Sequence, residues 1–170
     1  MIPMISVIGF SKTGKTTFVA DLVKELQALN YRVGVVKHDP EDHGEVDREH
    51  SDTSIFWNAG SPAVVLSSPG RLTIFRRTEE DTNPVAILPL LGDVDCVILE
   101  GYKGWSFPKV VIWSPAMRNI SIKQGELLAV ICNRQESHEA RSWAAGAAPV
   151  YSRDEIPGII ELLKETGLVK

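Results

Sequence analysis

The sequence predicts an α/β protein with a mostly parallel sheet that is covered by helices on both faces. Three observations lead to this prediction. Apolar runs rich in β-branched residues alternate with stretches of helical period, several of these runs are apolar throughout, and a glycine-containing segment follows the first of them. A strand that is apolar on both sides needs cover on both faces of its sheet, whereas a half-exposed strand would alternate.

The order of the elements follows from the same periodicities. We expect strands at residues 4–9, 32–37, 96–100, 109–113 and 127–132. The first helix should run from residue 15 to 29, because Phe18, Leu22 and Leu26 fall on one stripe, and Asn30 is its expected C-terminal stop. A last helix is expected over residues 157–166, before Gly167.

Two segments interrupt this alternation. Residues 63–76 hold two short β-prone runs around a Ser-Pro-Gly turn, which predicts a protruding β-hairpin. Residues 38–52 are polar, acidic and almost devoid of large apolar side chains, so we expect an exposed and mobile loop there.

Length and composition limit the classes of function. Residues 1–170 are enough for one α/β domain and too few for two ordinary ones, so a single domain is expected. The net charge of −4 argues against a nucleic-acid or anionic-membrane binder. The stretch MIPMISVIGF lacks the basic region of a secretory signal, and no apolar run is long enough to span a membrane, so a cytoplasmic protein is expected. Cys96 and Cys132 lie in apolar runs, where we expect no disulfide.

The segment GFSKTGKT at residues 9–16 carries the strongest chemical signal. It fits the pattern G-x-x-x-x-G-K-[ST] with Gly9, Gly14, Lys15 and Thr16, between a predicted strand and a predicted helix. Backbone N–H groups at a helix N-terminus concentrate partial positive charge, and glycines let them approach phosphate oxygens. Lys15 should then reach the outer phosphates, and the Thr16 hydroxyl should bind the Mg²⁺ of a nucleoside triphosphate. The pattern predicts a P-loop NTPase fold.

The residues expected to contact the nucleotide come from this loop and from the end of the second strand. Lys12 is open to two interpretations, contact with phosphate from within its own loop or simple solvation, and the second is preferred. The full set of expected contacts is Gly9, Ser11, Lys12, Thr13, Gly14, Lys15, Thr16, Thr17 and Lys37.

A Mg²⁺ site also needs a carboxylate at the nucleotide end of a neighbouring strand. Asp95 precedes the strand at 96–100 and Glu100 ends it, about 16 Å apart, so Glu100 alone can lie at that end. Asp39 follows the second strand and could hold a metal-bound water or orient the attacking water. Asp39 and Glu100 are therefore the candidate catalytic residues, and together with Thr16 they are the candidate metal ligands.

Two weaker patterns remain open. His38 and His43 lie among carboxylates, but their spacing fits no strong transition-metal pattern. The segment CNRQE at 132–136 distantly resembles the guanine-reading N-K-x-D, with Arg134 and Glu136 in the charged positions, and a chance loop is the preferred interpretation.

Several segments together resemble the MobB-type proteins of molybdopterin-guanine dinucleotide biosynthesis. The resemblance rests on GFSKTGKT, RVGVVKHD at 32–39, DTSIFWNAG at 52–60 and DCVILEGYKGWSFPK at 95–109, in this order. It covers about the first two thirds of the chain. The combination is more specific than the phosphate loop alone, which many NTPases share.

The resemblance implies a GTP-binding, Mg²⁺-dependent homodimer with weak GTPase activity. Such a protein is accessory to the MobA-type guanylyltransferase that joins GMP to molybdopterin, and molybdopterin itself is a further implied partner. The hairpin at 63–76 is the implied dimerisation element. Ser51, Ile55 and Trp57 stand where the family commonly has basic residues, which leaves open a different client.

Two alternative functions use the same loop. A small-molecule kinase would transfer the γ-phosphoryl group to an acceptor and would usually carry an arginine-rich lid. The later arginines are scattered at Arg118, Arg134, Arg141 and Arg153, which favours the adapter. A nucleotide-gated metal-delivery GTPase would need the histidines near His38. For the adapter we expect nucleotide to order residues 38–52 and the basal hydrolysis rate to be low.

Overall fold

The chain forms two compact units. The computed structural model describes residues 2–42, 44, 47–122 and 126–169. One unit comprises the residues up to His38 together with those from Leu88 onward, and the other is Asp39–Ile87. The expectation of a single domain stays a prediction, and the two units are described separately.

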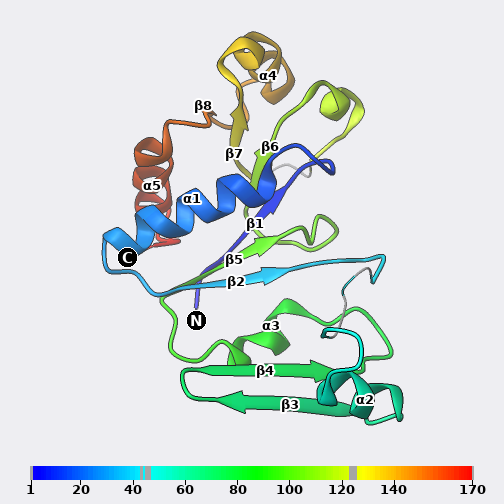
Figure 1. The fold of residues 1–170 in the computed structure, drawn as a ribbon. Coiled ribbons are helices and arrows are strands. Elements are labelled where there is room, and N and C mark those ends of the chain that lie inside the picture. Colours follow the sequence, from blue (N-terminus) through cyan, green and yellow to red (C-terminus); the bar gives the residue numbers. More distant parts are fainter. Residues whose placement is uncertain (1, 43, 45–46, 123–125, 170) are drawn as a thin grey trace. The chain divides into compact units, whose positions relative to one another are not determined.

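The first unit is built on a parallel sheet. In the described part of the chain the sheet has six strands in the order β2-β5-β1-β6-β7-β8 (Figure 1). Their bounds are β1 Met4–Ile8, β2 Val33–Lys37, β5 Cys96–Glu100, β6 Lys109–Ile112, β7 Leu127–Cys132 and β8 Val150–Ser152. Strand β1 pairs in parallel with β5 on one side and with β6 on the other. Strand β1 is therefore central: β2 and β5 lie on one side of it, and β6, β7 and β8 lie on the other. Where the strand order changes direction in this way, a crevice opens at the carboxyl ends of the strands.

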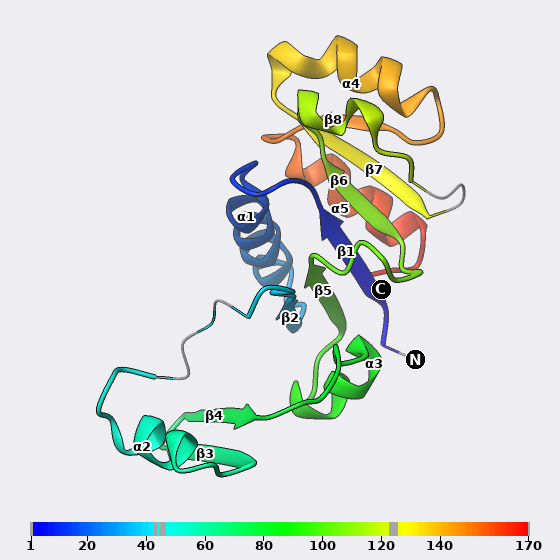
Figure 2. The same ribbon diagram turned by 90° about the vertical axis from the view of Figure 1, so that its right-hand side faces the viewer.

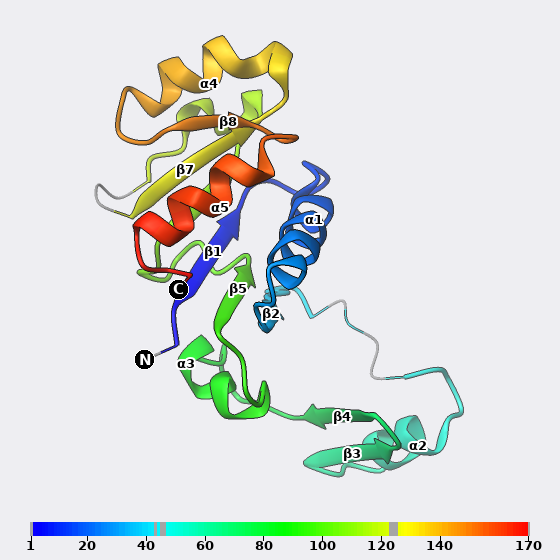
Figure 3. The same cartoon turned by 90° about the vertical axis from the view of Figure 1, so that its left-hand side faces the viewer.

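Helices cover both faces of this sheet, as the sequence predicts. Helices α1 (Lys15–Ala28) and α5 (Ile156–Glu165) lie side by side on one face, where they pack on Ile5, Ile98 and Ile131 (Figures 1 and 3). The opposite face is covered over β6 and β7 by the 3₁₀ turn η2 (Pro115–Asn119) and by α4 (Ser137–Ala144), around Trp113 (Figure 2). Within the described ranges, no helix has the length and apolarity needed to cross a membrane.

The predicted elements of this unit are confirmed to within a residue or two at each end. Asn30 takes a positive φ of 66° just after α1, as expected of a C-terminal stop. Strand β8 and helix α4 were not anticipated. The first is too short to show a period, and the second, SHEARSWA, is mostly polar and small. Cys96 and Cys132 are both buried free thiols. Burial raises the pKa of Cys96 to about 11, and the nearby Asp95 charge contributes to the increase.

The second unit contains the predicted hairpin. Strands β3 (Ala63–Ser68) and β4 (Arg71–Arg76) pair antiparallel and are joined by the turn Pro69 and Gly70, in which the glycine has a φ of 78°. Proline followed by a glycine of positive φ is the composition of a type II turn. Val65, Leu72 and Ile74 form an exposed apolar strip on one side of the hairpin. A role of this strip in dimerisation stays a prediction.

Helices α2 (Asp52–Asn58) and α3 (Pro84–Ile87) complete this unit, with the turn η1 (Leu88–Leu90) following in the first. Ser51 caps α2 by accepting a hydrogen bond from the Ser54 N–H. Arg77 lies over the Trp57 ring at 4.0 Å and donates to its carbonyl. The residues described between His38 and Ser51 form bends and turns that are largely exposed, in agreement with the predicted loop.

Candidate nucleotide-binding site

The loop between β1 and α1 has a backbone that requires its two glycines. Gly9 has a φ of 157°, and a Cβ there would lie 2.8 Å from the carbonyl oxygen of Ile112 on β6. Gly14 has a φ of 80° and is the N-cap of α1, and a Cβ there would lie 2.8 Å from the Arg153 guanidinium. At Gly9 the neighbouring backbone leaves no space for a side chain, and at Gly14 the positive φ disfavours one while the Arg153 guanidinium would have to move.

The beginning of α1 has the character of an anion site. Its N-cap, Gly14, has no side chain that could accept from the first amides, and the first turn consists of Lys15, Thr16 and Thr17. The amides at a helix N-terminus carry partial positive charge and lack partners within the helix. In this helix the lysine adds a positive charge and the two threonine hydroxyls add hydrogen-bond donors, so a phosphate group is the matching ligand.

Lys15 is folded back over its own loop. Its Nζ donates to the carbonyl oxygen of Phe10 at 2.6 Å, and the Thr13 hydroxyl donates to the same oxygen at 2.8 Å. Burial lowers the pKa of the Lys15 amine, the Glu100 carboxylate partly offsets this, and the Lys37 charge lowers the pKa further. An anion that reached this amine would replace a neutral carbonyl acceptor with a charged one, which makes a stronger bond to the ammonium group.

Thr16 and Glu100 meet although 84 residues separate them in the chain. The Thr16 hydroxyl donates to Glu100 Oε1 at 3.0 Å, and Glu100 is 8% exposed. Glu100 ends β5, where it lies opposite Val7 of β1 and Lys37 of β2. Mg²⁺ binds oxygens at 2.0–2.1 Å in an octahedron, so two adjacent ligands are about 2.9 Å apart. The hydroxyl and carboxylate thus fit the ion by type and by spacing.

The other predicted contacts lie on the loop itself, at the start of α1, at the end of β2 and in the second unit. Ser11, Lys12 and Thr17 have exposed side chains, and Lys12 has a φ of 61°. Lys37 is exposed at the end of β2. Asp39 is the first residue of the second unit, and its carboxylate accepts a hydrogen bond from the N–H of Glu41 at 3.4 Å. The assignment of these residues to nucleotide or metal stays a prediction.

The turn after β5 holds Glu100 in place. Gly101 has a φ of 102° and its carbonyl accepts from the Ser6 hydroxyl at 2.5 Å, while its N–H donates to Val7. Tyr102 is buried at a φ of 55° and stacks on the His38 ring with centroids 4.4 Å apart. The main chain on both sides of the Glu100 carboxylate is therefore fixed to β1 and to the end of β2.

The transition-metal hypothesis for the histidines gains no support from the described residues. His43 lies outside them. Within the described ranges no group of three or more His, Cys, Asp or Glu side chains is placed to hold a metal ion. A Mg²⁺ ion needs fewer protein ligands, because nucleotide phosphates and water complete its coordination.

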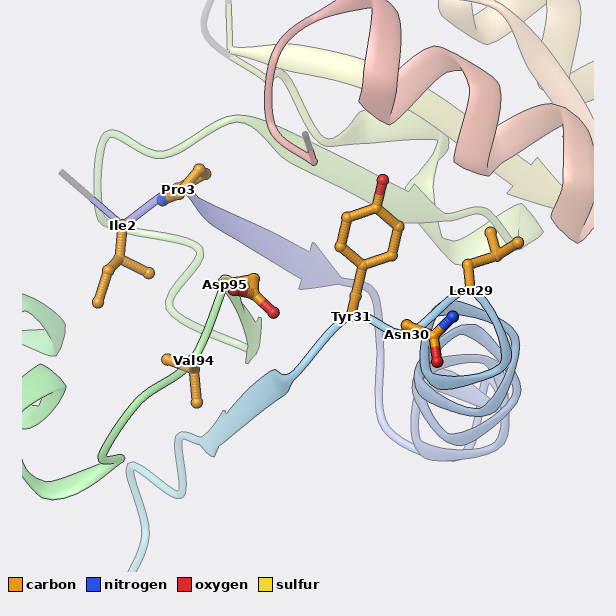
Figure 4. A pocket seen from close by; sticks show the side chains of 7 residues that line it. All are labelled: Ile2, Pro3, Leu29, Asn30, Tyr31, Val94 and Asp95. Carbon is orange, nitrogen blue, oxygen red and sulfur yellow. The ribbon is translucent and has the colours of Figure 1, made fainter.

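The opposite end of β5 carries Asp95 and has a different character. Hydrogen bonds from the Arg32 side chain and backbone lower the pKa of Asp95 to about 2, and Arg32 also pairs with Asp93. A hollow of about 670 Å³ lies beside Asp95, with Pro3 and Tyr31 on its wall (Figure 4). Asp95 precedes the strand that Glu100 ends, so this hollow lies at the amino end of the strands and the phosphate loop lies at the carboxyl end.

The segment CNRQE forms a capped helix start, and the interpretation that its likeness to the guanine-reading pattern is due to chance stays a prediction. It opens the turn η3 (Arg134–Glu136), which leads into α4. The Glu136 carboxylate accepts from the backbone N–H of Asn133 at 3.3 Å and from its side-chain amide at 2.9 Å. Asn-x-x-Glu is a capping pattern, and it was the available signal for this helix start. Arg134 forms an exposed ion pair with Asp154.

Arg153 is the site residue that sequence reasoning missed. Its guanidinium donates to the carbonyl oxygens of Thr13 and Gly14 in the phosphate loop, and its Nε donates to Asn133 Oδ1 at 3.0 Å. The contact joins residues 139 positions apart. The contact depends on the order of strands in the sheet, so no spacing in the sequence could have predicted it.

Comparison with known proteins identifies the family of this chain. A sequence profile described as "Molybdopterin guanine dinucleotide synthesis protein B" matches residues 4–133, which confirms the family resemblance. The chain is 28% identical over 137 residues to the "Probable molybdopterin-guanine dinucleotide biosynthesis adapter protein" of Bacillus subtilis, covering 79% of this chain and 78% of that one. It is 34% identical over 116 residues to the corresponding adapter protein of Haemophilus influenzae, covering 65% of this chain and 63% of that one.

Solved structures share the architecture. The crystal structure of Bacillus subtilis MobB aligns with a TM-score of 0.74 over 99% of both chains, at 24% identity. A crystal structure of molybdopterin-guanine biosynthesis protein B aligns with a TM-score of 0.71 over 96% of this chain and 97% of that chain, at 27% identity. These alignments confirm the predicted α/β fold class.

Proposed function

The chain belongs to the family of molybdopterin guanine dinucleotide synthesis protein B, and from this premise we propose that it is a GTP-binding adapter of molybdenum cofactor biosynthesis. In this proposal it binds GTP together with Mg²⁺ and hydrolyses it slowly. As a homodimer in the cytoplasm, it assists a MobA-type guanylyltransferase in attaching GMP to molybdopterin. The pathway is supported by the names of its relatives, and the nucleotide is supported by the loop between β1 and α1.

The observation that carries the proposal is the meeting of Thr16 and Glu100 at 3.0 Å beside the N-terminus of α1. A phosphate site alone would be served by the helix amides and Lys15. A hydroxyl and a buried carboxylate at the spacing of two adjacent Mg²⁺ ligands add the second requirement of a nucleoside triphosphate, which arrives with that ion. The combination favours a triphosphate over a simple anion.

Each residue has a distinct role in this proposal. The amides at the start of α1 and the Lys15 amine hold the phosphates, and Thr16 and Glu100 would hold Mg²⁺, which neutralises charge on the outer phosphate oxygens when bound. Glu100 is engaged by the Thr16 hydroxyl and would serve the cation, so it is not free to activate water. We therefore expect hydrolysis to be slow.

The later arginines support the adapter over the kinase. Arg118 pairs with Glu139, Arg134 pairs with Asp154, and Arg153 is bound to the phosphate loop. Each of these three guanidinium groups is thus bound by a partner within the fold, whereas the arginines of a kinase lid contact the transferred phosphates.

Calorimetric titration of the full chain with GTP, ATP and molybdopterin, each with and without Mg²⁺, tests the proposal. We expect GTP binding that is strengthened by Mg²⁺. Lys15→Ala should weaken it by about 100-fold or more, equivalent to about 2.7 kcal/mol, whereas Lys24→Ala, on an exposed face of the same helix, should leave it unchanged. Unchanged GTP affinity in Lys15→Ala would contradict the site. Tight ATP binding with phosphorylation of an acceptor would favour the kinase.

A further inference from the structure

Arg153 connects the last strand of the sheet to the phosphate loop. The residue directly follows β8, which is separated from β1 by β6 and β7. Its guanidinium nevertheless reaches the loop, where Nη2 donates to the Thr13 carbonyl and Nη1 donates to the Gly14 carbonyl at 3.4 Å. Arg153 lies beyond the segment 4–133 that matches the family profile.

The guanidinium is held in this orientation by Asn133. Arg153 Nε donates to Asn133 Oδ1 at 3.0 Å, and the Asn133 amide nitrogen donates to Glu136 at 2.9 Å. The second bond decides which end of the amide faces Arg153. The Arg153 backbone N–H also donates to the Cys132 carbonyl at 3.2 Å. Both the main chain and the planar head of Arg153 are therefore fixed before any ligand arrives.

Holding these two carbonyls determines where two amides point. A trans peptide is planar, and its C=O and N–H point in opposite directions. The Thr13 carbonyl shares a peptide plane with the Gly14 N–H, and the Gly14 carbonyl shares one with the Lys15 N–H. The Gly14 carbonyl also accepts the first hydrogen bond of α1, from the Phe18 N–H at 3.1 Å, so the helix itself helps to set the Lys15 N–H. Arg153 acts chiefly on the Thr13 carbonyl. When it draws that oxygen toward the end of β8, the Gly14 N–H turns away from it, toward the side where an anion would be bound.

The absence of a side chain at Gly14 leaves room for the Arg153 guanidinium. A Cβ on Gly14 would lie 2.8 Å from Arg153 Nη1, so the guanidinium occupies the space that a side chain would take. The φ of 80° at Gly14 is also unfavourable for other residues. Glycine has more accessible backbone conformations than other residues, and Arg153 contacts the loop at this residue.

We propose that Arg153, oriented by Asn133, is a positioning residue of the phosphate loop, which it holds in the conformation that binds phosphate. This inference rests on the proposed function, because it assumes that nucleotide phosphates bind at this loop. It assigns to the C-terminal segment a direct part in the site. The ligand class is the polyphosphate chain itself, whatever base it carries.

The test compares the wild-type chain with Arg153→Ala, Arg153→Lys and the control Arg118→Ala, an exposed arginine with a single ion pair. GTP and inorganic tripolyphosphate are titrated into each protein in the presence of Mg²⁺, and the thermal midpoint and binding stoichiometry are recorded. Arg153→Ala should lose about 10- to 100-fold in affinity, because charged hydrogen bonds to the loop are removed. The loss should be equal for both ligands. Arg118→Ala should bind as the wild type does.

Two further readouts separate positioning from simple stabilisation. Guanidinium ion, at concentrations far below those that denature the protein, should restore part of the affinity of Arg153→Ala. Arg153→Lys should lie between alanine and wild type, since it keeps the charge and loses the planar fork. A variant that loses stoichiometry at unchanged affinity, or that weakens GTP but not tripolyphosphate, would overturn the proposal. If Arg153→Ala binds both ligands with wild-type affinity, the role of Arg153 is overturned and the proposed function stands. If the wild-type chain binds neither ligand, the proposed function and the role of Arg153 are both overturned.

Discussion

The two ends of strand β5 each carry a carboxylate, and the surroundings of these carboxylates differ. At the amino end, Asp95 accepts hydrogen bonds from the Arg32 guanidinium and N–H, so its charge is balanced within the fold. At the carboxyl end, Glu100 is buried against the Thr16 hydroxyl, a neutral partner. A carboxylate that has its own arginine stabilises the structure, whereas one that faces a hydroxyl near the phosphate loop is available to a cation that is bound from solution.

Two lysines show the same difference between a group that stabilises the fold and one that is available to a ligand. Lys109 opens β6, is 2% exposed, and donates to the carbonyls of Trp105 and Phe107 and to the Glu126 carboxylate at 2.5 Å. The three N–H donors of its ammonium group are thus matched by three acceptors. Lys15 is partly exposed and donates to the Phe10 carbonyl. The buried lysine serves the fold, and the phosphate-loop lysine can exchange its carbonyl for a ligand.

The largest expected effect is on stability and comes from Lys109→Ala. The substitution removes a buried ammonium group that makes three hydrogen bonds and one half of a buried ion pair, which should lower the free energy of unfolding by about 3–5 kcal/mol. Urea denaturation followed by tryptophan fluorescence measures this change. Lys103→Ala, an exposed lysine of the same connection, is the matched control. If Lys109→Ala unfolds at the same urea concentration as the wild type, the assignment of Lys109 to the fold is wrong.

Gly101→Ala should affect both stability and nucleotide binding, because Gly101 directly follows Glu100 at the carboxyl end of β5. Its φ is 102°, and an added Cβ would lie 3.0 Å from the Cβ of His38. A residue strained in this way costs about 1–3 kcal/mol. We expect a lower denaturation midpoint together with weaker Mg²⁺-dependent GTP binding. Gly104→Ala, where a Cβ would meet nothing within 4 Å, should change neither quantity.

Glu100→Gln should separate the two properties. The amide keeps an oxygen for the Thr16 hydroxyl but loses the charge that suits Mg²⁺. GTP affinity in the presence of Mg²⁺ should fall roughly tenfold, equivalent to about 1.4 kcal/mol, while affinity in EDTA and the thermal midpoint should stay close to those of the wild type. An equal loss with and without Mg²⁺ would argue that Glu100 acts on the loop instead of the ion.

The smallest expected effect is that of Asp95→Asn on the pH dependence of stability. The pKa of Asp95 is about 2 in the folded chain, below the usual value of 3.8. Because the folded pKa is depressed, the stabilisation is fully present above about pH 4 and is lost as the pH falls through about 2. Thermal midpoints measured between pH 2 and 5 should fall less steeply in Asp95→Asn. Part of the slope should persist, since Arg134 lowers the pKa of Asp154 to about 2 as well.

Much of the geometry of the candidate phosphate site could be predicted from the sequence because its determinants are local. Gly14, Lys15 and Thr16 follow one another at the start of a helix, and their conformations depend on near neighbours and on the strand that precedes them. Glu100 could be predicted as well, since parallel strands bring their carboxyl ends to one edge. The short strand β8 could not, because three residues of ordinary composition carry no periodic signal.

The sequence by itself determined the parallel α/β fold, the hairpin and the phosphate loop, since hydrophobic period, turn residues and glycine positions act over a few residues at a time. The tertiary structure alone decided that Arg153 reaches this loop. Strand order brings its guanidinium to the carbonyls of Thr13 and Gly14, across 140 and 139 positions of the chain, a separation over which composition and spacing carry no geometric information. For Glu100 the sequence indicated the correct end of its strand, and the register of the sheet then set the contact with Thr16 at 3.0 Å.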